Sequence, residues 1–158
     1  MRYSWLILLV LLVGCASRPS ERAIINMPVS DVLPLAEEGD SNAMHALCYR
    51  YLYGEDGAQK NYETAFKWCE KSALTGQSSS LTLLAEMYYL GQYVKRDYDK
   101  AFTYYKKAAG KDHNHAQFML FVMYNSGQSV EKDIKKAEYW IKRAARNGNP
   151  QAQKILRN

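Results

Sequence analysis

Three histidines and three cysteines are the side chains of this sequence most able to bind a metal or to react. His45 and Cys48 are three residues apart, which places both on one face of a helix, and His113 and His115 flank a single asparagine. A structural zinc ion needs four ligands, and the sequence offers no further two for either pair. We therefore predict no metal site and no cofactor.

A serine and a lysine could also act together. Ser129-Val-Glu-Lys132 matches the S-x-x-K pattern of penicillin-recognising enzymes, in which the serine is the nucleophile. The companion motifs S-D-N and K-T-G are absent from the sequence. An enzyme that acts on cell-wall material through Ser129 and Lys132 is therefore the less favoured interpretation, and we predict that the protein is not an enzyme.

The third cysteine follows an apolar segment near the N-terminus. Arg2 precedes an apolar run from Trp5 to Val13, which is too short for a permanent transmembrane helix of about 20 residues and fits a secretory signal. The residues 12–15 (Leu-Val-Gly-Cys) resemble the lipobox of bacterial lipoproteins. That resemblance implies a signal peptide over residues 1–14, a lipidated Cys15 and a tether over residues 15–31.

The resemblance also implies a location. No aspartate follows Cys15, which in the Gram-negative sorting pattern favours the outer membrane, with the protein facing the periplasm. An ordinary signal peptide or a buried apolar N-terminus is the alternative.

The charge of the chain indicates no nucleic-acid partner. The full sequence has a net charge of +5, and loss of Arg2 with the signal leaves 20 − 16 = +4. The basic residues are interleaved with acidic ones at helical spacing and form no basic block, so we predict no nucleic-acid binding.

The elements that position these residues are repeated along the chain with a period of 36 or 37 residues. A small residue is followed by leucine, tyrosine and glycine, and a loop then leads to alanine, an aromatic residue and a second alanine. The recurring positions are Ala43, Ser80, Ala116 and Ala152; Leu47, Leu84, Leu120 and Leu156; Tyr51, Tyr88 and Tyr124; Gly54, Gly91 and Gly127; Ala65, Ala101 and Ala137; Trp68, Tyr104 and Trp140; and Ala73, Ala109 and Ala145.

Each unit reads as two helices. The spacing of four residues from Ala43 to Leu47 and Tyr51 is one face of an α-helix that Gly54 ends. Asn61, Asp97 and Asp133 are suitable N-caps for the second helices. A two-helix unit buries its apolar face only by stacking on neighbours. We predict an all-α domain over residues 32–158, with three full units (43–76, 80–112 and 116–148) between capping helices.

The repeated unit resembles the Sel1-like repeat, a relative of the tetratricopeptide repeat. The family pattern A-x-x-x-L-G, tyrosine, loop, aspartate, K-A-x-x-W-Y and A-A recurs three times over about residues 32–157. Cys48, Ala85 and Phe121 replace the family glycine. The resemblance implies a right-handed α/α superhelix that binds proteins.

The two remaining cysteines occupy facing positions of one unit. Cys48 corresponds to Ala85 and Phe121, and Cys69 to Tyr105 and Ile141. Counting along both helices from their connecting loop places Cys48 and Cys69 at similar height. In an exported, oxidising compartment we predict a Cys48–Cys69 disulfide, with two buried free thiols as the alternative.

The partner surface is inferred from tetratricopeptide proteins, in which the first helix of each unit lines a concave face. When the first helices of this chain are aligned with those of tetratricopeptide repeats, the positions on the concave face are His45, Tyr49, Leu52, Tyr53, Thr82, Glu86, Tyr89, His115, Phe118, Val122 and Asn125. The loop side, with Glu55, Asp56, Tyr93 and Gln128, is a second candidate surface.

We therefore predict a membrane-anchored periplasmic module for protein–protein interaction. Its partner would be a secreted toxin or an envelope assembly component. The more specific alternative is an immunity protein that neutralises a lipase-type toxin delivered to the periplasm, because some Sel1-like lipoproteins with this layout have that role.

Overall fold

The computed structural model describes residues 19–157, all of whose regular elements are helices. The predicted signal peptide and the predicted lipidation site Cys15 lie outside the described residues. The helices are α1 (Glu21–Ile25), α2 (Val29–Glu37), α3 (Ser41–Tyr53), α4 (Tyr62–Leu74), α5 (Ser78–Leu90), α6 (Tyr98–Ala109), α7 (Asn114–Ser126), α8 (Ile134–Arg146) and α9 (Pro150–Arg157). None of the helices in residues 19–157 is long and apolar enough to cross a membrane.

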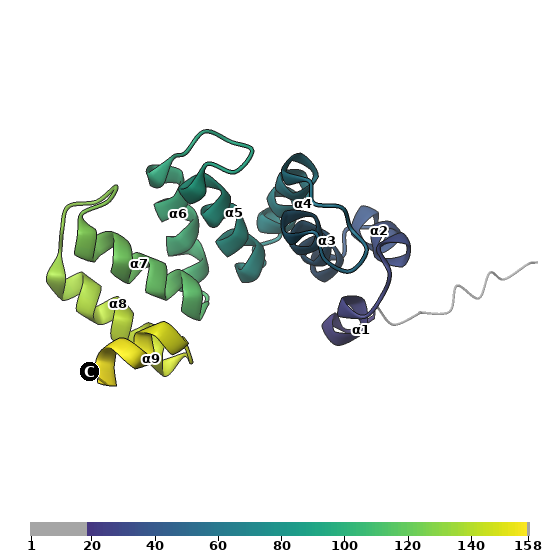
Figure 1. Cartoon of the computed structure of the whole chain (residues 1–158). Coiled ribbons are helices and arrows are strands. Elements are labelled where there is room, and N and C mark those ends of the chain that lie inside the picture. Colours follow the sequence, from purple (N-terminus) through teal and green to yellow (C-terminus); the bar gives the residue numbers. More distant parts are fainter. Residues whose placement is uncertain (1–18, 158) are drawn as a thin grey trace, which may run out of the picture.

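The helices form three antiparallel hairpins, which confirms the predicted all-α solenoid. α3 packs on α4, α5 on α6 and α7 on α8, and each hairpin also contacts the next. α2 packs on the first hairpin and α9 on the last, as the capping helices were expected to do. In Figure 1 the hairpins follow a curve from α1 to α9, and the first helices α3, α5 and α7 lie towards its inside.

The ends of the helices are set by local sequence, as predicted. The carboxamide or carboxylate oxygens of Asn61, Asp97 and Asp133 each accept the backbone N–H three residues on, at 2.9 Å. At the end of each first helix a glycine adopts a left-handed conformation (Gly54, φ 77°), which other residues rarely adopt.

A backbone hydrogen bond closes each hairpin at the same place. The N–H groups of the capping residues Asn61, Asp97 and Asp133 donate to the carbonyls of the recurring tyrosines 51, 88 and 124, at 2.8, 2.9 and 3.0 Å. The bond persists although the first loop is one residue longer than the other two. This hydrogen bond therefore sets the position of the second helix along the first in every hairpin, and the length of the loop does not change it.

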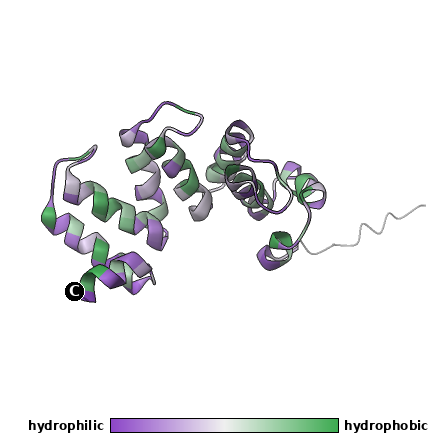
Figure 2. Ribbon diagram, in the orientation of Figure 1, coloured by the Kyte–Doolittle hydropathy of each residue, from purple (hydrophilic) through white to green (hydrophobic). Residues whose placement is uncertain are grey.

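The core consists of the recurring small and apolar positions. Leu47, Leu84 and Leu120 are fully buried, as are alanines at the helix crossings such as Ala65 and Ala116. Small side chains allow the helix backbones to approach closely. Figure 2 shows that α3, α5 and α7 are the more apolar helices, whereas α8 alternates between polar and apolar residues.

The predicted disulfide is present in the first hairpin. Cys48 of α3 and Cys69 of α4 are bonded, with their Cα atoms 4.9 Å apart and both side chains fully buried. The distance lies within the range that a disulfide can bridge without backbone distortion. The cross-link therefore joins the two helices of one repeat, at the position where the second repeat has Ala85 and Tyr105.

Tyr105 carries a buried hydroxyl without a hydrogen-bond partner among the described residues. Burial, followed by the Glu86 carboxylate, raises the pKa of Tyr105. An unsatisfied buried hydroxyl costs about 1–3 kcal/mol. We expect Tyr105→Phe to leave the free energy of unfolding unchanged or to raise it by about 1 kcal/mol, as measured by urea unfolding. A loss of stability would instead show that a water molecule satisfies this hydroxyl.

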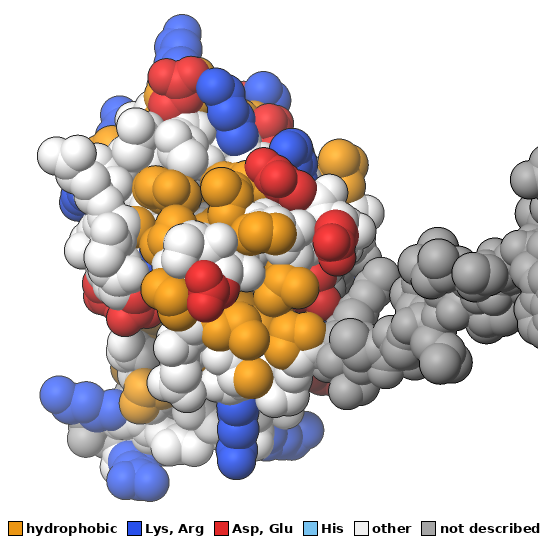
Figure 3. Space-filling view, turned by 90° about the vertical axis from the view of Figure 1, so that its right-hand side faces the viewer, with side chains coloured by type: hydrophobic (Ala, Val, Ile, Leu, Met, Phe, Trp, Pro, Cys, Tyr) orange, Lys and Arg blue, Asp and Glu red, His pale blue; other side chains and the backbone are white. Residues whose placement is uncertain are grey.

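The N-terminal segment differs from its prediction. We expected a tether over residues 15–31, but Ser20 caps a short helix, α1, whose Ile24 is buried against α3. The fold therefore begins about ten residues earlier than expected, because Ile24 covers apolar surface at the open end of the first hairpin. Figure 3 shows this end of the molecule, where apolar side chains remain visible between carboxylates.

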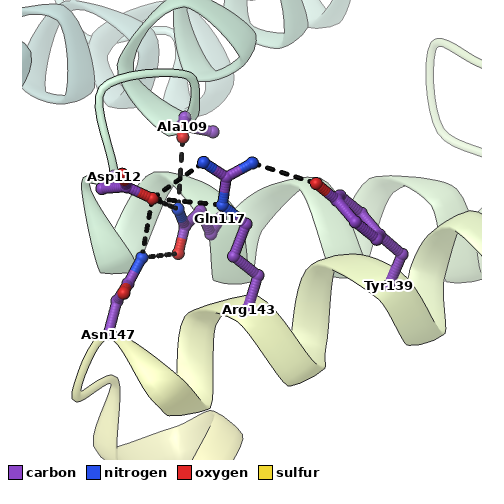
Figure 4. Close-up of polar contacts among 6 residues, drawn as sticks. All are labelled: Ala109, Asp112, Gln117, Tyr139, Arg143 and Asn147. Carbon is purple, nitrogen blue, oxygen red and sulfur yellow. Dashed lines mark hydrogen bonds and ion pairs between the residues drawn. The ribbon is translucent and has the colours of Figure 1, made fainter.

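Asp112 explains one departure from the repeat. It occupies a left-handed position (φ 62°) where the other units have glycine. Its Oδ1 accepts hydrogen bonds from Arg143 Nε and Nη2 (3.1 and 2.8 Å), from Asn147 Nδ2 (3.0 Å) and from Gln117 Nε2 (3.1 Å). Figure 4 shows how these side chains converge. The carboxylate therefore ties the second repeat to the third.

This network predicts an acid-sensitive contact. Hydrogen bonds from Arg143 and Asn147 lower the pKa of Asp112 from 3.8. Its stabilisation is therefore present above pH 3.8 and is lost as the pH falls through the lower pKa of the folded state. We expect Asp112→Asn to lower the melting temperature near pH 7, with a difference from wild type that narrows below pH 3.8. A constant difference from pH 7 to pH 2.5 would contradict this.

Candidate functional site

The inner surface of the solenoid is the candidate site. We define it by those residues predicted from the register of α3, α5 and α7 that are accessible and lie outside the apolar packing: His45, Tyr49, Tyr53, Glu86, His115 and Asn125. Tyr49 is 39% exposed and Tyr53 is 44% exposed, and their rings pack with centroids 4.7 Å apart. Two neighbouring tyrosines that remain half exposed offer a partner both apolar area and hydroxyl groups. The first repeat therefore contributes most of the exposed aromatic area of this surface.

Glu86 lies at the centre of the inner surface and joins the three repeats. The Tyr53 hydroxyl donates to Glu86 Oε2 at 3.4 Å, and His115 Nε2 lies 2.9 Å from Oε1. Burial, followed by the Glu86 carboxylate, raises the pKa of Tyr53. One carboxylate from the second repeat thus orients side chains from the first and the third.

His45 lies deeper in the same surface. Its Nδ1 is 3.1 Å from the Ser80 hydroxyl, and burial lowers the pKa of the imidazole from 6.5. The ring is therefore neutral at pH 7. It links α3 to α5 and is only half exposed to a partner.

Some residues predicted for partner binding are not available on this surface. Thr82 is 3% exposed and donates its hydroxyl to the Ser78 carbonyl at 2.9 Å, and Leu52 is 2% exposed. These two assignments are wrong, because both side chains are buried and Thr82 is bonded within its own helix. Register alone could not reveal this.

Three other predicted residues are half buried. Tyr89 packs edge-on against Tyr98 and Tyr105, at 5.1 and 6.4 Å between ring centroids, and Phe118 packs against Phe121 at 5.7 Å. Val122 is half buried as well. Substitution of these residues would disturb the packing between helices.

The histidine and cysteine pairs serve other purposes. Cys48 is in the disulfide, and His113 is the N-cap of α7, where its Nδ1 accepts the Ala116 N–H at 3.4 Å. His115 pairs with Glu86. Within residues 19–157 no group of three or more His, Cys, Asp or Glu side chains could hold a metal ion.

Ser129 and Lys132 lie in the loop between α7 and α8. The Ser129 hydroxyl donates to the Asp99 carboxylate of the preceding repeat. No hydrogen bond joins Ser129 to Lys132 among the described residues, and the Lys132 side chain stem lies against Gly127. The serine is thus occupied in a contact between repeats and is not paired with a base.

Sequence reasoning missed Arg50, the largest fully buried side chain of the described chain. Its Nη2 donates to the carbonyls of Ile24 and Ile25 at 3.1 and 2.9 Å, and its Nε lies 3.2 Å from Asp56 Oδ2. The available signal was a single charge in the otherwise apolar segment from Leu47 to Tyr53. Arg50 holds α1, α3 and the first loop together at one end of the inner surface.

The comparisons with known proteins agree with this architecture. A family model described as Sel1 repeat matches residues 41–76, 78–113 and 114–149. A search of curated proteins found no match. A Sel1 repeat protein from Oxalobacter formigenes is 35% identical, with a TM-score of 0.76. A protective antigen present in uropathogenic Escherichia coli strains, which displays an SLR fold, is 33% identical, also with a TM-score of 0.76.

The two similar structures are longer than this chain. The alignments cover 81% of the chain in both cases, but 52% of the Oxalobacter protein and 27% of the Escherichia coli antigen. Cysteine rich protein B of Helicobacter pylori shares the fold at 24% identity, with a TM-score of 0.64, over 82% of this chain and 98% of its own. Three matched repeats cover most of the chain, and it therefore belongs to the Sel1 repeat family.

Proposed function

We propose that the protein is a lipid-anchored module of the bacterial envelope that binds a protein partner through its inner surface. Proteins built of Sel1 repeats generally mediate protein–protein interactions, and the fold is typically a non-catalytic scaffold. The observation that supports the inner surface most directly is the exposed pair of Tyr49 and Tyr53. Tyrosine is enriched among the residues that contribute most to binding at interfaces.

The distribution of charge favours the same surface. The only Lys, Arg, Asp or Glu residues of α3, α5 and α7 are Arg50, which is buried, and Glu86. The second helices carry many lysines, for example Lys106 and Lys107 of α6 and Lys142 of α8. The centres of interfaces are depleted of charged residues and enriched in aromatic ones, which matches the inside of the curve and not its outside.

A comparison of two double variants tests the surface. Tyr49→Ala with Tyr53→Ala removes the exposed aromatic pair, and Ile134→Ala with Tyr139→Ala removes two side chains of α8 that are 49% and 54% exposed. The chain beginning at Ala16 keeps every described residue and is used for capture from envelope extracts and secreted proteins. The proposal expects one partner to be lost with the first variant only. Equal capture by both variants would place the site elsewhere.

The identity of the partner separates two versions of the proposal. A lipase-type toxin among the captured proteins, neutralised by the wild-type chain, would support an immunity protein. A component of envelope assembly would support an accessory role. Both versions require the tyrosine pair.

The anchor is tested separately. The residues 12–15 resemble a lipobox, and acyl chains contribute about 0.8 kcal/mol of membrane binding for each buried methylene. The proposal expects radiolabelled palmitate to be incorporated into the full-length chain and to remain with the outer-membrane fraction. Cys15→Ala should abolish the label, whereas labelling that survives the substitution would rule out Cys15 as the acceptor.

A further inference from the structure

The two candidate surfaces that the sequence suggested meet in one cavity. A pocket of about 450 Å³ opens at the N-terminal end of the solenoid. Its walls include Glu21 and Ile25 of α1, Tyr49 and Arg50 of α3, and Glu55 and Asp56 of the first loop. Tyr49 and its neighbour His45 belong to the inner surface, so the pocket continues that surface to its end.

The pocket contains more carboxylates than basic side chains. Arg50 is 2% exposed and is neutralised by Asp56, whose carboxylate lies 3.2 Å from Arg50 Nε. Glu21 and Glu55 then remain as carboxylates without a salt bridge among the described residues. The pocket therefore has an excess negative charge of about two, beside an open aromatic ring.

Arg50 also belongs to the lining of the pocket. Its Nη1 atom is fully buried and has no hydrogen-bond partner among the described residues. A buried guanidinium N–H without an acceptor is costly, and native proteins rarely leave one. Because this atom is buried, it offers no open donor to a ligand, and Arg50 serves the pocket through the contacts of Nη2 and Nε.

Tyr49 provides a second element of recognition, because Tyr49 and Glu55 both line the pocket. Burial, followed by the charge of Glu55, raises the pKa of Tyr49. A ring beside a carboxylate is a favourable site for an organic cation, because the ring face and the carboxylate both attract positive charge.

We propose that this pocket receives an arginine or lysine side chain of the protein partner. The cation lies between the Glu21 and Glu55 carboxylates and the Tyr49 ring, and the aliphatic stem packs on Ile25. The proposal rests on the proposed function and adds the chemistry of the partner: a segment with an exposed basic residue.

Arg50 is the positioning residue of the pocket. Through the carbonyls of Ile24 and Ile25 it holds α1 as one wall, and through Asp56 it holds the loop as another. The pocket thus exists only while α1 is docked. Its binding strength is therefore coupled to the order of the segment that directly follows the proposed anchor.

A titration with small probes tests the pocket without the partner. N-acetyl-arginine-N-methylamide is added to the chain beginning at Ala16, and the Tyr49 ring and Glu55 amide resonances are followed by NMR. The expected result is a saturable change with a millimolar dissociation constant, and weaker binding of the neutral N-acetyl-glutamine analogue. Absence of saturation, or equal binding of the glutamine analogue, would overturn the proposal.

Glutamate-to-glutamine variants remove the charge of a side chain and keep its shape, so they test the contribution of charge to binding of the probe. Glu21→Gln with Glu55→Gln should weaken binding of the arginine probe about fivefold, which is the scale of two partly exposed ion pairs. Glu63→Gln, on the exposed face of α4, is the matched control and should leave the affinity unchanged. Preferential binding of the N-acetyl-aspartate analogue would show that Arg50 dominates and would also overturn the proposal.

The outcomes distinguish this proposal from the proposed function. If the partner is captured through Tyr49 and Tyr53 but the arginine probe does not bind, the inner surface is the site and the cation pocket is wrong. If the probe binds but no partner depends on the two tyrosines, the pocket is real and the proposed function is wrong.

Discussion

Reduction of the Cys48–Cys69 disulfide should lower the free energy of unfolding by about 3 kcal/mol. The bond closes a loop with a sequence separation of 21 residues, and in the chain-entropy model a loop of that length gives roughly this stabilisation. For a domain of this size the loss corresponds to about 10 °C in melting temperature. Circular dichroism melting curves with and without a phosphine reductant measure it.

The double variant Cys48→Ala with Cys69→Ala is the control for the reductant. It should melt at least as low as the reduced wild type, because it also loses buried volume, and it should not respond to reductant. Wild-type curves that coincide with and without reductant, together with two titratable thiols after denaturation, would show that the cysteines are free. The buried free thiols considered from the sequence would then be correct.

Arg50→Met should destabilise the N-terminal end of the fold by roughly 3 kcal/mol. The substitution removes the Arg50 bonds to the carbonyls of Ile24 and Ile25, and bonds from a charged donor contribute about 1.5–3 kcal/mol each. The Ile24 carbonyl keeps its bond from the Met27 N–H, and the Ile25 bond is only partly buried, so the sum stays near the value for one full bond. Asp56 is 53% exposed, so loss of the ion pair adds little. Urea unfolding measures the total, and hydrogen exchange of the α1 amides measures the local effect.

Arg96→Met is the matched control, because Arg96 is exposed and lies over the Tyr98 ring at 5.3 Å. Its effect should stay within about 0.5 kcal/mol. Equal stability of the two variants would show that α1 is held by burial of Ile24 and not by Arg50. Faster exchange in α1 without a change elsewhere would locate the loss in the N-terminal cap.

The sequence alone determined the repeat. Its period, the spacing of Ala43, Leu47 and Tyr51, and the caps Asn61, Asp97 and Asp133 are local features, and each helix end follows from hydrogen bonds within four residues. The pairing of Cys48 with Cys69 could also be predicted from the sequence. One short loop connects the two helices of a hairpin, so residues at equal distances from that loop lie opposite each other.

Tertiary structure alone decided which side chains reach the surface. The burial of Thr82, the half-burial of Tyr89, the docking of Ile24 and the role of Arg50 depend on how repeats stack and on how the N-terminal segment covers the first of them. Arg50 and Ile24, for example, are 26 positions apart in the sequence. A small change in the angle between hairpins exchanges an exposed side chain for a buried one. The period of the sequence therefore predicts the two-helix repeat, but the way in which the repeats stack decides which side chains are accessible to a partner.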